Sequence, residues 1–429
     1  MNLLLIPPTK LKRVVIIGGG FGGIELAKRL DASKYQVVML DKNNYHTFQP
    51  LLYQVATGGL EPDSIAYPIR KIFQGKRNFI FRMAEAKHIN TETKSIDTTL
   101  GALYYDILVI ATGSTTNFFG NKQTEESSMP LKSVVDALNL RSLILQNMEK
   151  QLSSKDEEEM AQLQNIVIVG GGPTGVEIAG ALAELKNHVL PRDYPELNLN
   201  ALHIFLVESS PEVLGNLSRK AQKKSKLFLE KLGVKLMLKT RVEKFENDTV
   251  FLSEGSQIKS KTLIWTAGVM GCPVAGLDAS HIGKANRILT DVYNRISGYN
   301  EVYAIGDVCA VTDNTITALT PHPQVAPVAM QQAKNLANNL NRHAGDWEKF
   351  RYRDLGSMAT IGRNKAVADL GKIKLQGILA WFVWMFVHLM SIVGFRNRLV
   401  VLVNWMWNYF SYDRAIRLII RPFKREKGN

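Results

Sequence analysis

Three glycines near the start of the chain have the spacing of a dinucleotide-binding loop. Gly18, Gly20 and Gly23 follow the apolar run VVII and precede the helical pattern IELAKRL. The first glycine permits a tight turn, the second lets a pyrophosphate approach the backbone, and the third lets the helix pack on the strand. The phosphates then meet the positive end of the helix dipole. Asp41 ends the next apolar strand, where an acid can accept hydrogen bonds from an adenosine ribose.

The same pattern recurs 152 residues later, in NIVIVGGGPTGVEIAGALAEL. Gly170, Gly172 and Gly175 take the three glycine positions, and the following strand, LHIFLVE, ends in Glu208. This acid comes later than in the first site because an insertion, residues 186–201, separates the helix from the strand. Glu208 would repel a 2′-phosphate, so the second site is predicted to prefer NADH to NADPH. Two dinucleotide sites in one chain indicate that a hydride passes between two cofactors.

Further strands end in residues that join these two halves. LYYDILVIATGS ends in Ala111, Thr112 and Gly113, TLIWTAGV is its counterpart after the second site, and NEVYAIGDVCA places Asp307 after a strand. This order resembles the flavoproteins with two dinucleotide-binding domains, in which the Gly-Asp carboxylate reaches the flavin ribitol or pyrophosphate. The resemblance assigns FAD to the first site, with the expected contacts Gly18, Gly20, Gly23, Asp41, Ala111, Thr112, Gly113 and Asp307.

Cysteine placement distinguishes the members of this superfamily. Disulfide reductases carry a cysteine pair after the ribose acid, but residues 41–60 contain no cysteine, and sulfide oxidation also needs a pair beside the flavin. The only two cysteines, Cys272 and Cys309, have no redox or metal-binding spacing. We therefore interpret them as a loop thiol and a small buried side chain, and expect no metal site.

Residues 11–370 resemble the type II NADH:quinone dehydrogenases. The resemblance is carried by DKNNYHTFQPLLYQVATG, GGGPTGVE, IWTAG, VYAIGD and PQVAPVAMQQAKNLANNL. It implies that NADH reduces FAD and that FAD passes two electrons to a lipid-soluble quinone, menaquinone or ubiquinone, without proton pumping. The family motif Ala-Gln-x-Ala-x-Gln, which lines the quinone tunnel, begins here at Ala326; Pro327 replaces its first glutamine and Gln331 retains its second. Ala326, Pro327 and Gln331 are therefore the expected quinone contacts.

Glu177, two residues after Gly175, matches a family glutamate implicated near the nicotinamide and quinone pockets. The resemblance makes Glu177 and Gln331 the expected catalytic residues. From the residues alone, a carboxylate in the first turn of a helix would also be favoured by the helix dipole. His46 and His388 are expected to be structural.

The end of the chain is apolar and aromatic. Residues 375–395 carry no formal charge, and about 30 Å of helix would be long enough to cross a bilayer. The next apolar run, residues 399–410, is too short to return as a membrane-spanning helix. Tryptophan prefers the lipid headgroup boundary, and basic side chains bind anionic lipid. The tail contains four of the six tryptophans, Trp381, Trp384, Trp405 and Trp407, and the basic residues Arg396, Arg398, Arg414, Arg417, Arg421, Lys424, Arg425 and Lys427.

These features predict that the tail lies in one leaflet, with a membrane span or a pair of helices at a homodimer interface as alternatives. The net charge of +14 supports a membrane surface as partner, because the chain has no nucleic-acid-binding motif. MNLLLIPPTKLKR has too short an apolar run for a signal peptide, so the enzyme is expected on the cytoplasmic face of the inner (plasma) membrane.

The predicted fold is α/β, with two Rossmann-like domains and a helical membrane-associating region at the C-terminus. The FAD-binding domain is expected to be discontinuous, with the NADH-binding domain inserted into it. The expected ranges are 11–120 and 288–365 for FAD, 160–287 for NADH and 366–429 for the tail. Two other functions stay open: a reductase for a soluble protein acceptor such as ferredoxin or rubredoxin, and a flavin-binding scaffold that senses NADH at the membrane.

Overall fold

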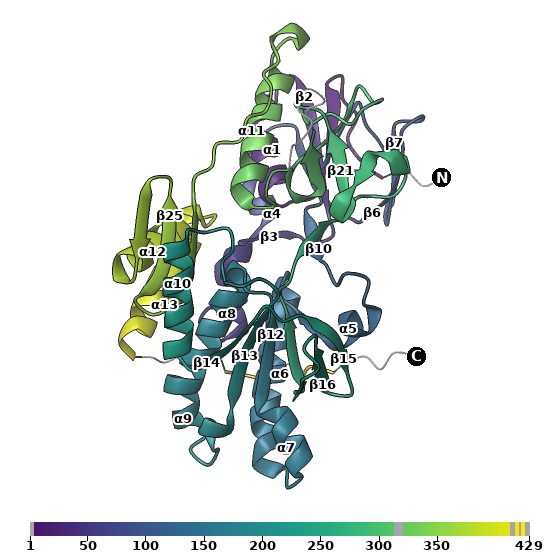
Figure 1. Ribbon diagram of the computed structural model, residues 1–429. Helices are drawn as coiled ribbons and strands as arrows, with labels where there is room; N and C mark the ends of the chain where they lie inside the picture. Colours follow the sequence, from purple (N-terminus) through teal and green to yellow (C-terminus); the bar gives the residue numbers. More distant parts are fainter. Residues whose placement is uncertain (1–3, 313–320, 412–416, 420–421, 425–429) are drawn as a thin grey trace. The chain divides into compact units, whose positions relative to one another are not determined.

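The structure is a computed structural model that describes residues 4–312, 321–411, 417–419 and 422–424. The chain forms two compact units, each assembled from separate segments (Figure 1). Unit 1 comprises Met1–His46, Tyr67–Thr115 and Val269–Asp354. Unit 2 comprises Thr47–Ala66, Thr116–Gly268 and Leu355–Asn429.

Unit 1 is built on a five-stranded parallel sheet with the order β22-β9-β1-β2-β5. The strands are β1 Lys12–Ile17, β2 Tyr35–Asp41, β5 Phe79–Met83, β9 Ile107–Ile110 and β22 Val302–Ala304. The inner strands are continuous apolar runs because helices and loops cover both faces of a parallel sheet. Helices α1 (Phe21–Arg29) and α11 (Ala326–Asn341) pack against each other in this unit. A small antiparallel sheet completes it, formed by β6 Ala86–Asn90, β7 Ser95–Thr98 and β8 Gly101–Tyr104.

Unit 2 repeats this plan with the sheet order β11-β18-β12-β13-β14. The strands are β11 Met129–Pro130, β12 Asn165–Val169, β13 His203–Glu208, β14 Val234–Leu238 and β18 Thr262–Trp265. In both sheets the strand before the glycine cluster is central, and the strand that ends in the ribose acid lies beside it. Its helices include α2 Leu52–Ala56, α6 Val134–Ser153, α8 Pro173–Glu184 and α10 Arg219–Lys231. The predicted pair of Rossmann-like α/β halves is confirmed.

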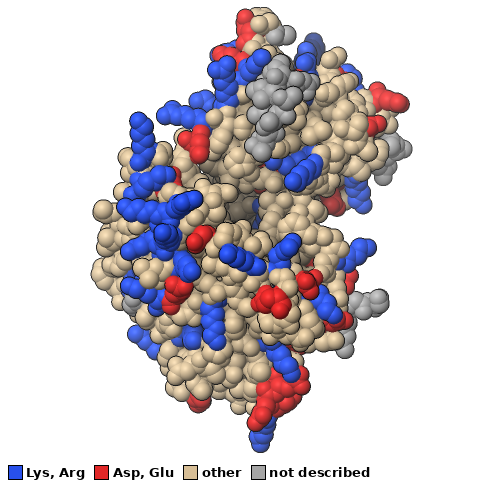
Figure 2. Space-filling view, in the orientation of Figure 1, with Lys and Arg blue, Asp and Glu red and all other residues tan. Residues whose placement is uncertain are grey.

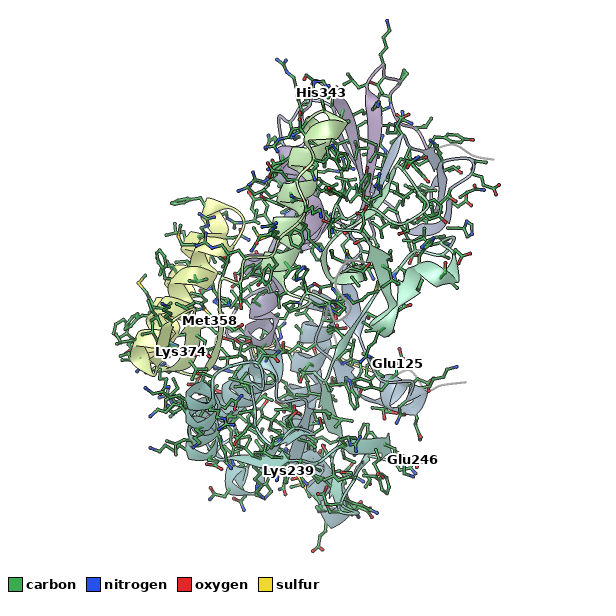
Figure 3. The ribbon with its side chains drawn as sticks, turned by 45° about the horizontal axis from the view of Figure 1, so that its top comes forward. Glu125, Lys239, Glu246, His343, Met358 and Lys374 are labelled. Carbon is green, nitrogen blue, oxygen red and sulfur yellow. The ribbon has the colours of Figure 1, made fainter. Side chains whose placement is uncertain are left out.

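The end of the chain is part of unit 2. Strands β24 (Ser357–Gly362), β25 (Lys365–Leu370) and β26 (Ile373–Gln376) form an antiparallel sheet, followed by α12 (Ile378–Ser391) and α13 (Phe395–Ser411). Figure 1 shows α10, α12 and β25 side by side, and β25 contacts both helices. Figure 3 labels Met358 and Lys374 on this sheet.

The units differ from the predicted domain boundaries at several places. Thr47–Ala66, predicted to belong to the FAD-binding domain, lies in unit 2, and residues 269–287, predicted to belong to the NADH-binding domain, lie in unit 1. Unit 1 ends at Asp354, so β24 belongs with the NADH-binding half rather than with the FAD-binding half. A boundary between residues 365 and 366 would cut through β25. The uncharged stretch 375–395 is also not one helix, because α12 ends at Ser391 and Gly394, with a φ of 88°, separates it from α13. Within the part of the chain that the structure describes, no helix combines the length and apolar character needed to cross a membrane.

Candidate functional site

The first glycine loop connects β1 to α1 and has the shape of a pyrophosphate cradle. A β-carbon added at Gly23 would lie 1.9 Å from the Gly18 carbonyl oxygen, so only glycine allows this close approach. A β-carbon at Gly20 would meet no atom within 4 Å, so the backbone there faces open space. Asp41 Oδ2 accepts a hydrogen bond from Gly19 N at 2.6 Å. Burial raises the pKa of Asp41, and backbone hydrogen bonds offset part of that rise. These residues fit the adenosine diphosphate part of FAD.

Asp307 lies on a short turn of unit 1 directly after β22. Its Oδ2 accepts a hydrogen bond from Ser114 Oγ at 2.6 Å, and its carbonyl oxygen accepts one from Gln324 Nε2 at 2.9 Å. The preceding residue, Gly306, donates its N–H to the buried Gln332 Oε1 at 2.7 Å. Three side chains therefore fix the segment that carries the expected flavin ligand.

The segment Ala111-Thr112-Gly113 follows β9 and lies beside the first glycine loop in unit 1. Ala111 N donates to Ile17 O at 2.8 Å, and a β-carbon added at Gly18 would lie 2.3 Å from the Ala111 carbonyl oxygen. Thr112 Oγ1 donates to Cys272 O at 2.6 Å. All eight residues expected to hold FAD thus belong to unit 1. Both cysteines are free, and Cys309 is buried.

His46 is a positioning residue of the first site. Its Nδ1 lies 3.1 Å from Gly19 O, and its ring packs edge-on against Phe21 at 4.9 Å. Burial lowers the pKa of His46 to about 4, so its imidazole is neutral near pH 7. A neutral ring can donate from Nδ1 and hold the loop in place.

The second glycine loop repeats this geometry in unit 2. A β-carbon added at Gly175 would lie 1.8 Å from Gly170 O, and one at Gly172 would meet no atom within 4 Å. Glu208 accepts hydrogen bonds from Gly171 N at 2.6 Å and from Ser210 N at 2.7 Å. Burial alone would raise the pKa of Glu208, but the hydrogen bonds from Ser210, Gly171 and Ser209 outweigh it and lower the pKa.

Glu177 is buried inside unit 2. The first-turn interpretation is wrong, because α8 begins at Pro173 and Glu177 lies beyond its first turn. Burial raises the pKa of Glu177 to about 8, and a long hydrogen bond from Thr360 N, 3.5 Å, offsets little of this. The indole N–H of Trp384 also lowers the pKa somewhat, but it makes no hydrogen bond of normal geometry with a described residue. Glu177 is therefore a neutral acid near pH 7.

A cavity of about 120 Å³ lies beside this carboxyl group, and we call it the aromatic cavity. It is enclosed by α2, α8, β24, α12 and α13, all of unit 2. Its aromatic side chains come mainly from the tail: Tyr53, Trp381, Trp384, Trp405 and Tyr409. Trp405 Nε1 donates to Gln54 Oε1 at 2.8 Å, which ties α13 to α2.

The quinone motif begins helix α11 of unit 1. Pro327 occupies the first helical turn, where a proline is favourable because its missing N–H has no helical partner there. Gln331 is half-buried, and its amide pairs with the backbone of Arg353: Nε2 donates to Arg353 O at 2.9 Å and Oε1 accepts from Arg353 N at 3.0 Å. Gln331 and Glu177 lie in different units.

The tail tryptophans do not form the predicted interfacial belt. Trp384 and Trp405 are buried in unit 2, at 2% and 8% exposure, and Trp381 is half-buried, whereas Trp407 is 63% exposed. Instead, aliphatic and phenylalanine side chains form the outer surface. We call this surface the apolar face; it consists of Ile378, Leu379, Phe382, Phe386, Val387, Met390, Phe395, Leu399, Val403, Met406, Trp407 and Phe410. Arg414, Arg421, Arg425 and Lys427 lie outside the described residues.

Several positioning residues escape sequence reasoning. Gln332, Gln324 and Ser114 hold the Asp307 segment through side-chain hydrogen bonds, but no glycine spacing or strand pattern marks them. Sequence reasoning places Trp384 at the lipid headgroup boundary because tryptophan prefers that position. Trp384 is four residues from both Ala380 and His388, so these three residues share one side of α12, opposite Phe382 and Phe386. This spacing is the sequence signal that predicts a core position for Trp384.

Comparison with known proteins agrees with this geometry. Residues 12–333 match the family "Pyridine nucleotide-disulphide oxidoreductase", and residues 355–411 match "NDH2 C-terminal domain". The chain is 34% identical to the type II NADH:quinone oxidoreductase Ndh of Mycobacterium tuberculosis, over 95% of this chain and 90% of that protein. It is 33% identical to an internal alternative NAD(P)H-ubiquinone oxidoreductase of Solanum tuberosum, over 92% and 86%.

Solved structures share the fold. The structure of NDH2 from Plasmodium falciparum in complex with NADH aligns with a TM-score of 0.88 at 21% identity, covering 96% of this chain and all of that one. Sulfide:quinone oxidoreductase from Aquifex aeolicus aligns with a TM-score of 0.70 at 18% identity, covering 93% and 95%. On the sequence matches along nearly its whole length, the chain belongs to the type II NADH:quinone oxidoreductase family.

Proposed function

We propose that this protein oxidises NADH through FAD and reduces a lipid-soluble quinone by two electrons at a membrane surface, without pumping protons. The observation that carries the proposal is the aromatic cavity with the neutral Glu177 on its wall, enclosed by the same two helices whose outer side is the apolar face. FAD, when bound, supplies the chemistry that accepts a hydride and passes on two electrons.

The two glycine loops perform the binding. Gly18, Gly20 and Gly23 hold the pyrophosphate of FAD, and Asp41 binds its adenosine ribose. Gly170, Gly172 and Gly175 do the same for NADH, with Glu208 on the ribose. A carboxylate at this position repels a 2′-phosphate, which supports NADH as the electron donor.

Glu177 and Gln331 are the proposed catalytic residues. Forming a quinol consumes two protons, and Glu177 holds a proton at its carboxyl group near pH 7 because its pKa is raised to about 8. The Gln331 amide uses one N–H and one oxygen lone pair on the Arg353 backbone, so its second N–H and second lone pair are the groups proposed for a quinone contact, with Ala326 and Pro327 beside it. Pro327 offers no polar side-chain atom, so its contact is apolar.

The apolar face supports attachment to one leaflet of the bilayer. The cytoplasmic side is proposed because NADH is a cytoplasmic substrate. Exposed apolar surface of this extent is unusual for a soluble monomer and marks a membrane or protein contact. The absence of a spanning helix among the described residues agrees with attachment to one side. A second copy of the chain is the alternative partner of the apolar face. A reductase for a soluble acceptor would need neither a membrane nor a second copy on this face.

The test is steady-state NADH oxidation by the purified, FAD-loaded protein. We expect turnover with a short-chain quinone to exceed turnover with ferredoxin or rubredoxin by at least about tenfold. Turnover only with the iron–sulfur proteins would overturn the proposal, and slow turnover with every acceptor would favour the sensing scaffold. Flotation with vesicles measures membrane attachment, and sedimentation in detergent measures dimer formation. The two measurements together show which partner covers the apolar face.

A further inference from the structure

A second cavity of unit 2, of about 650 Å³, is not used in the proposed reaction, although Glu184 and Arg363 line both this cavity and the aromatic cavity. It is partly open to solvent and is lined from α10, the π-helical turn after α8, the β24–β25 turn and the start of α12. We call it the basic cavity because its charged lining contains Lys224, Arg363 and Lys365, against a single carboxylate, Glu184. Figure 2 shows Lys and Arg gathered over the region where Figure 1 draws α10, α12 and β25.

Two of the three cationic side chains, Arg363 and Lys224, have contacts that position them. Arg363 donates from its guanidinium to Asn408 O at 2.5 Å and lies over the Tyr409 ring at 4.9 Å, so α13 fixes its direction. Lys224 lies over the ring of Phe228, another lining residue, at 5.0 Å. Arg363 N donates to Glu184 Oε1 at 2.5 Å, which draws the one carboxylate toward the backbone of the turn. Positioned cations around a cavity of this size form a site for an anion.

The insertion found in the sequence contributes to the same cavity. Residues Leu185–Val189 continue α8 as one turn of π-helix, a rare conformation that occurs frequently at functional sites. This turn places His188 on the wall of the basic cavity. The middle of the insertion interacts with the tail through the ion pair between Asp193 and Arg417. The insertion therefore connects the cavity to the segment that carries the apolar face.

The rim of the basic cavity continues directly into the apolar face. Gly377 lines the cavity, and the next two residues, Ile378 and Leu379, are 47% and 64% exposed. An occupant could thus place an anionic group among the cations and a hydrocarbon chain along α12. We infer that the basic cavity binds the phosphodiester headgroup of an anionic membrane lipid, a second lipid-derived ligand besides the quinone. This inference rests on the membrane attachment in the proposed function.

The experiment measures binding of the full-length, FAD-loaded protein to vesicles of phosphatidylcholine alone and of phosphatidylcholine mixed equally with phosphatidylglycerol. The test variant combines Lys224→Glu with Lys365→Glu. The control variant combines Lys223→Glu with Lys372→Glu, an equal charge change at two exposed lysines outside the cavity. Flavin content and circular dichroism verify folding, and a Lys224→Gln, Lys365→Gln pair replaces the test variant if it misfolds.

We expect the test variant to lose about tenfold or more of the binding gain that phosphatidylglycerol gives, and the control less than about threefold. Equal losses in both variants would overturn the inference, because they would show diffuse charge attraction. No loss in either would overturn it too. Inorganic phosphate at matched ionic strength should not displace the protein from the mixed vesicles; displacement would show a site for soluble phosphate. The vesicle-binding assay contains neither NADH nor quinone. Its outcome is therefore independent of the turnover assay that tests the proposed function.

Discussion

The two glycine motifs carry a glutamate at the same position but place it in opposite environments. Gly23-Ile24-Glu25 begins α1, and Gly175-Val176-Glu177 occupies the same place in α8. Glu25 forms an ion pair with Arg29, one turn later on the surface of α1. Glu177 is buried and has a pKa raised to about 8.

The difference comes from what packs on each helix. In unit 1, α1 packs against α11, which leaves Glu25 at the edge of the contact. In unit 2, β24 crosses α8 so closely that a β-carbon at Gly180 would lie 1.9 Å from Ile361 O, and Trp384 of α12 covers the carboxyl group. One local motif therefore yields a surface ion pair or a neutral buried acid, depending on segments far away in the sequence.

The largest effect is expected from removing the Trp384 side chain, which covers the Glu177 carboxyl group. Trp384 is 2% exposed and stacks on His388 with ring centroids 4.1 Å apart. Trp384→Ala should lower the free energy of unfolding by about 3–5 kcal/mol, because it leaves a large cavity, and should let water reach Glu177. Trp407→Ala, at an exposed tryptophan of α13, should change it by less than about 0.5 kcal/mol. Denaturant unfolding measures the free energy of unfolding of both variants. Equal decreases would show that Trp384 is not packed in the core.

The pH dependence of stability sharpens the comparison. The folded-state pKa of Glu177 is about 8, above its ordinary value of 4.5, so between these values the folded state binds more protons than the unfolded state. The free energy of unfolding should therefore fall as pH rises through this window. Glu177→Gln should remove the fall, an effect on the order of 1–4 kcal/mol. A pH profile unchanged by Glu177→Gln would contradict the buried acid.

The ribose acids offer a third comparison, with a smaller expected effect. Glu208→Gln combined with Ser210→Arg should raise kcat/KM for NADPH relative to NADH by about tenfold, because the change replaces repulsion of a 2′-phosphate by attraction. The same ratio should not move with Asp41→Asn, since Asp41 belongs to the first site. Unchanged NADPH turnover in the double variant would show that Glu208 does not contact the nucleotide ribose.

Flavin retention tests the first site independently of turnover. Asp307→Ala should yield protein with little yellow colour, because it removes a carboxylate held at the end of β22 by Ser114. The absorbance spectrum after purification measures this loss. A full flavin spectrum would count against Asp307 as an FAD ligand.

The local parts of the fold could be predicted from the sequence, because strand, glycine loop, helix and acid follow one another within short windows. Both Rossmann-like halves, and the strands that precede Gly113 and Asp307, are predicted in this way. The environment of Glu177 could not be predicted, since it depends on β24 and α12, more than 180 residues away.

The tail shows the same limit. Its composition predicted a lipid contact, yet half of its tryptophans fill the core of unit 2, because helices with apolar residues on all sides can bury one side and expose the other. Deleting residues 372–429 would therefore remove part of that core together with the apolar face. Point substitutions on the exposed side, such as Phe386→Ser, are the cleaner test of membrane attachment.

The most direct measurement is the infrared carboxyl signal of Glu177, obtained as the difference between the native protein and Glu177→Gln. A neutral carboxyl band present at about pH 6 and lost on titration to about pH 9 is the predicted result. A carboxylate band already complete at about pH 6 would show that Glu177 is ionised, and the central claim of a neutral buried acid would be contradicted.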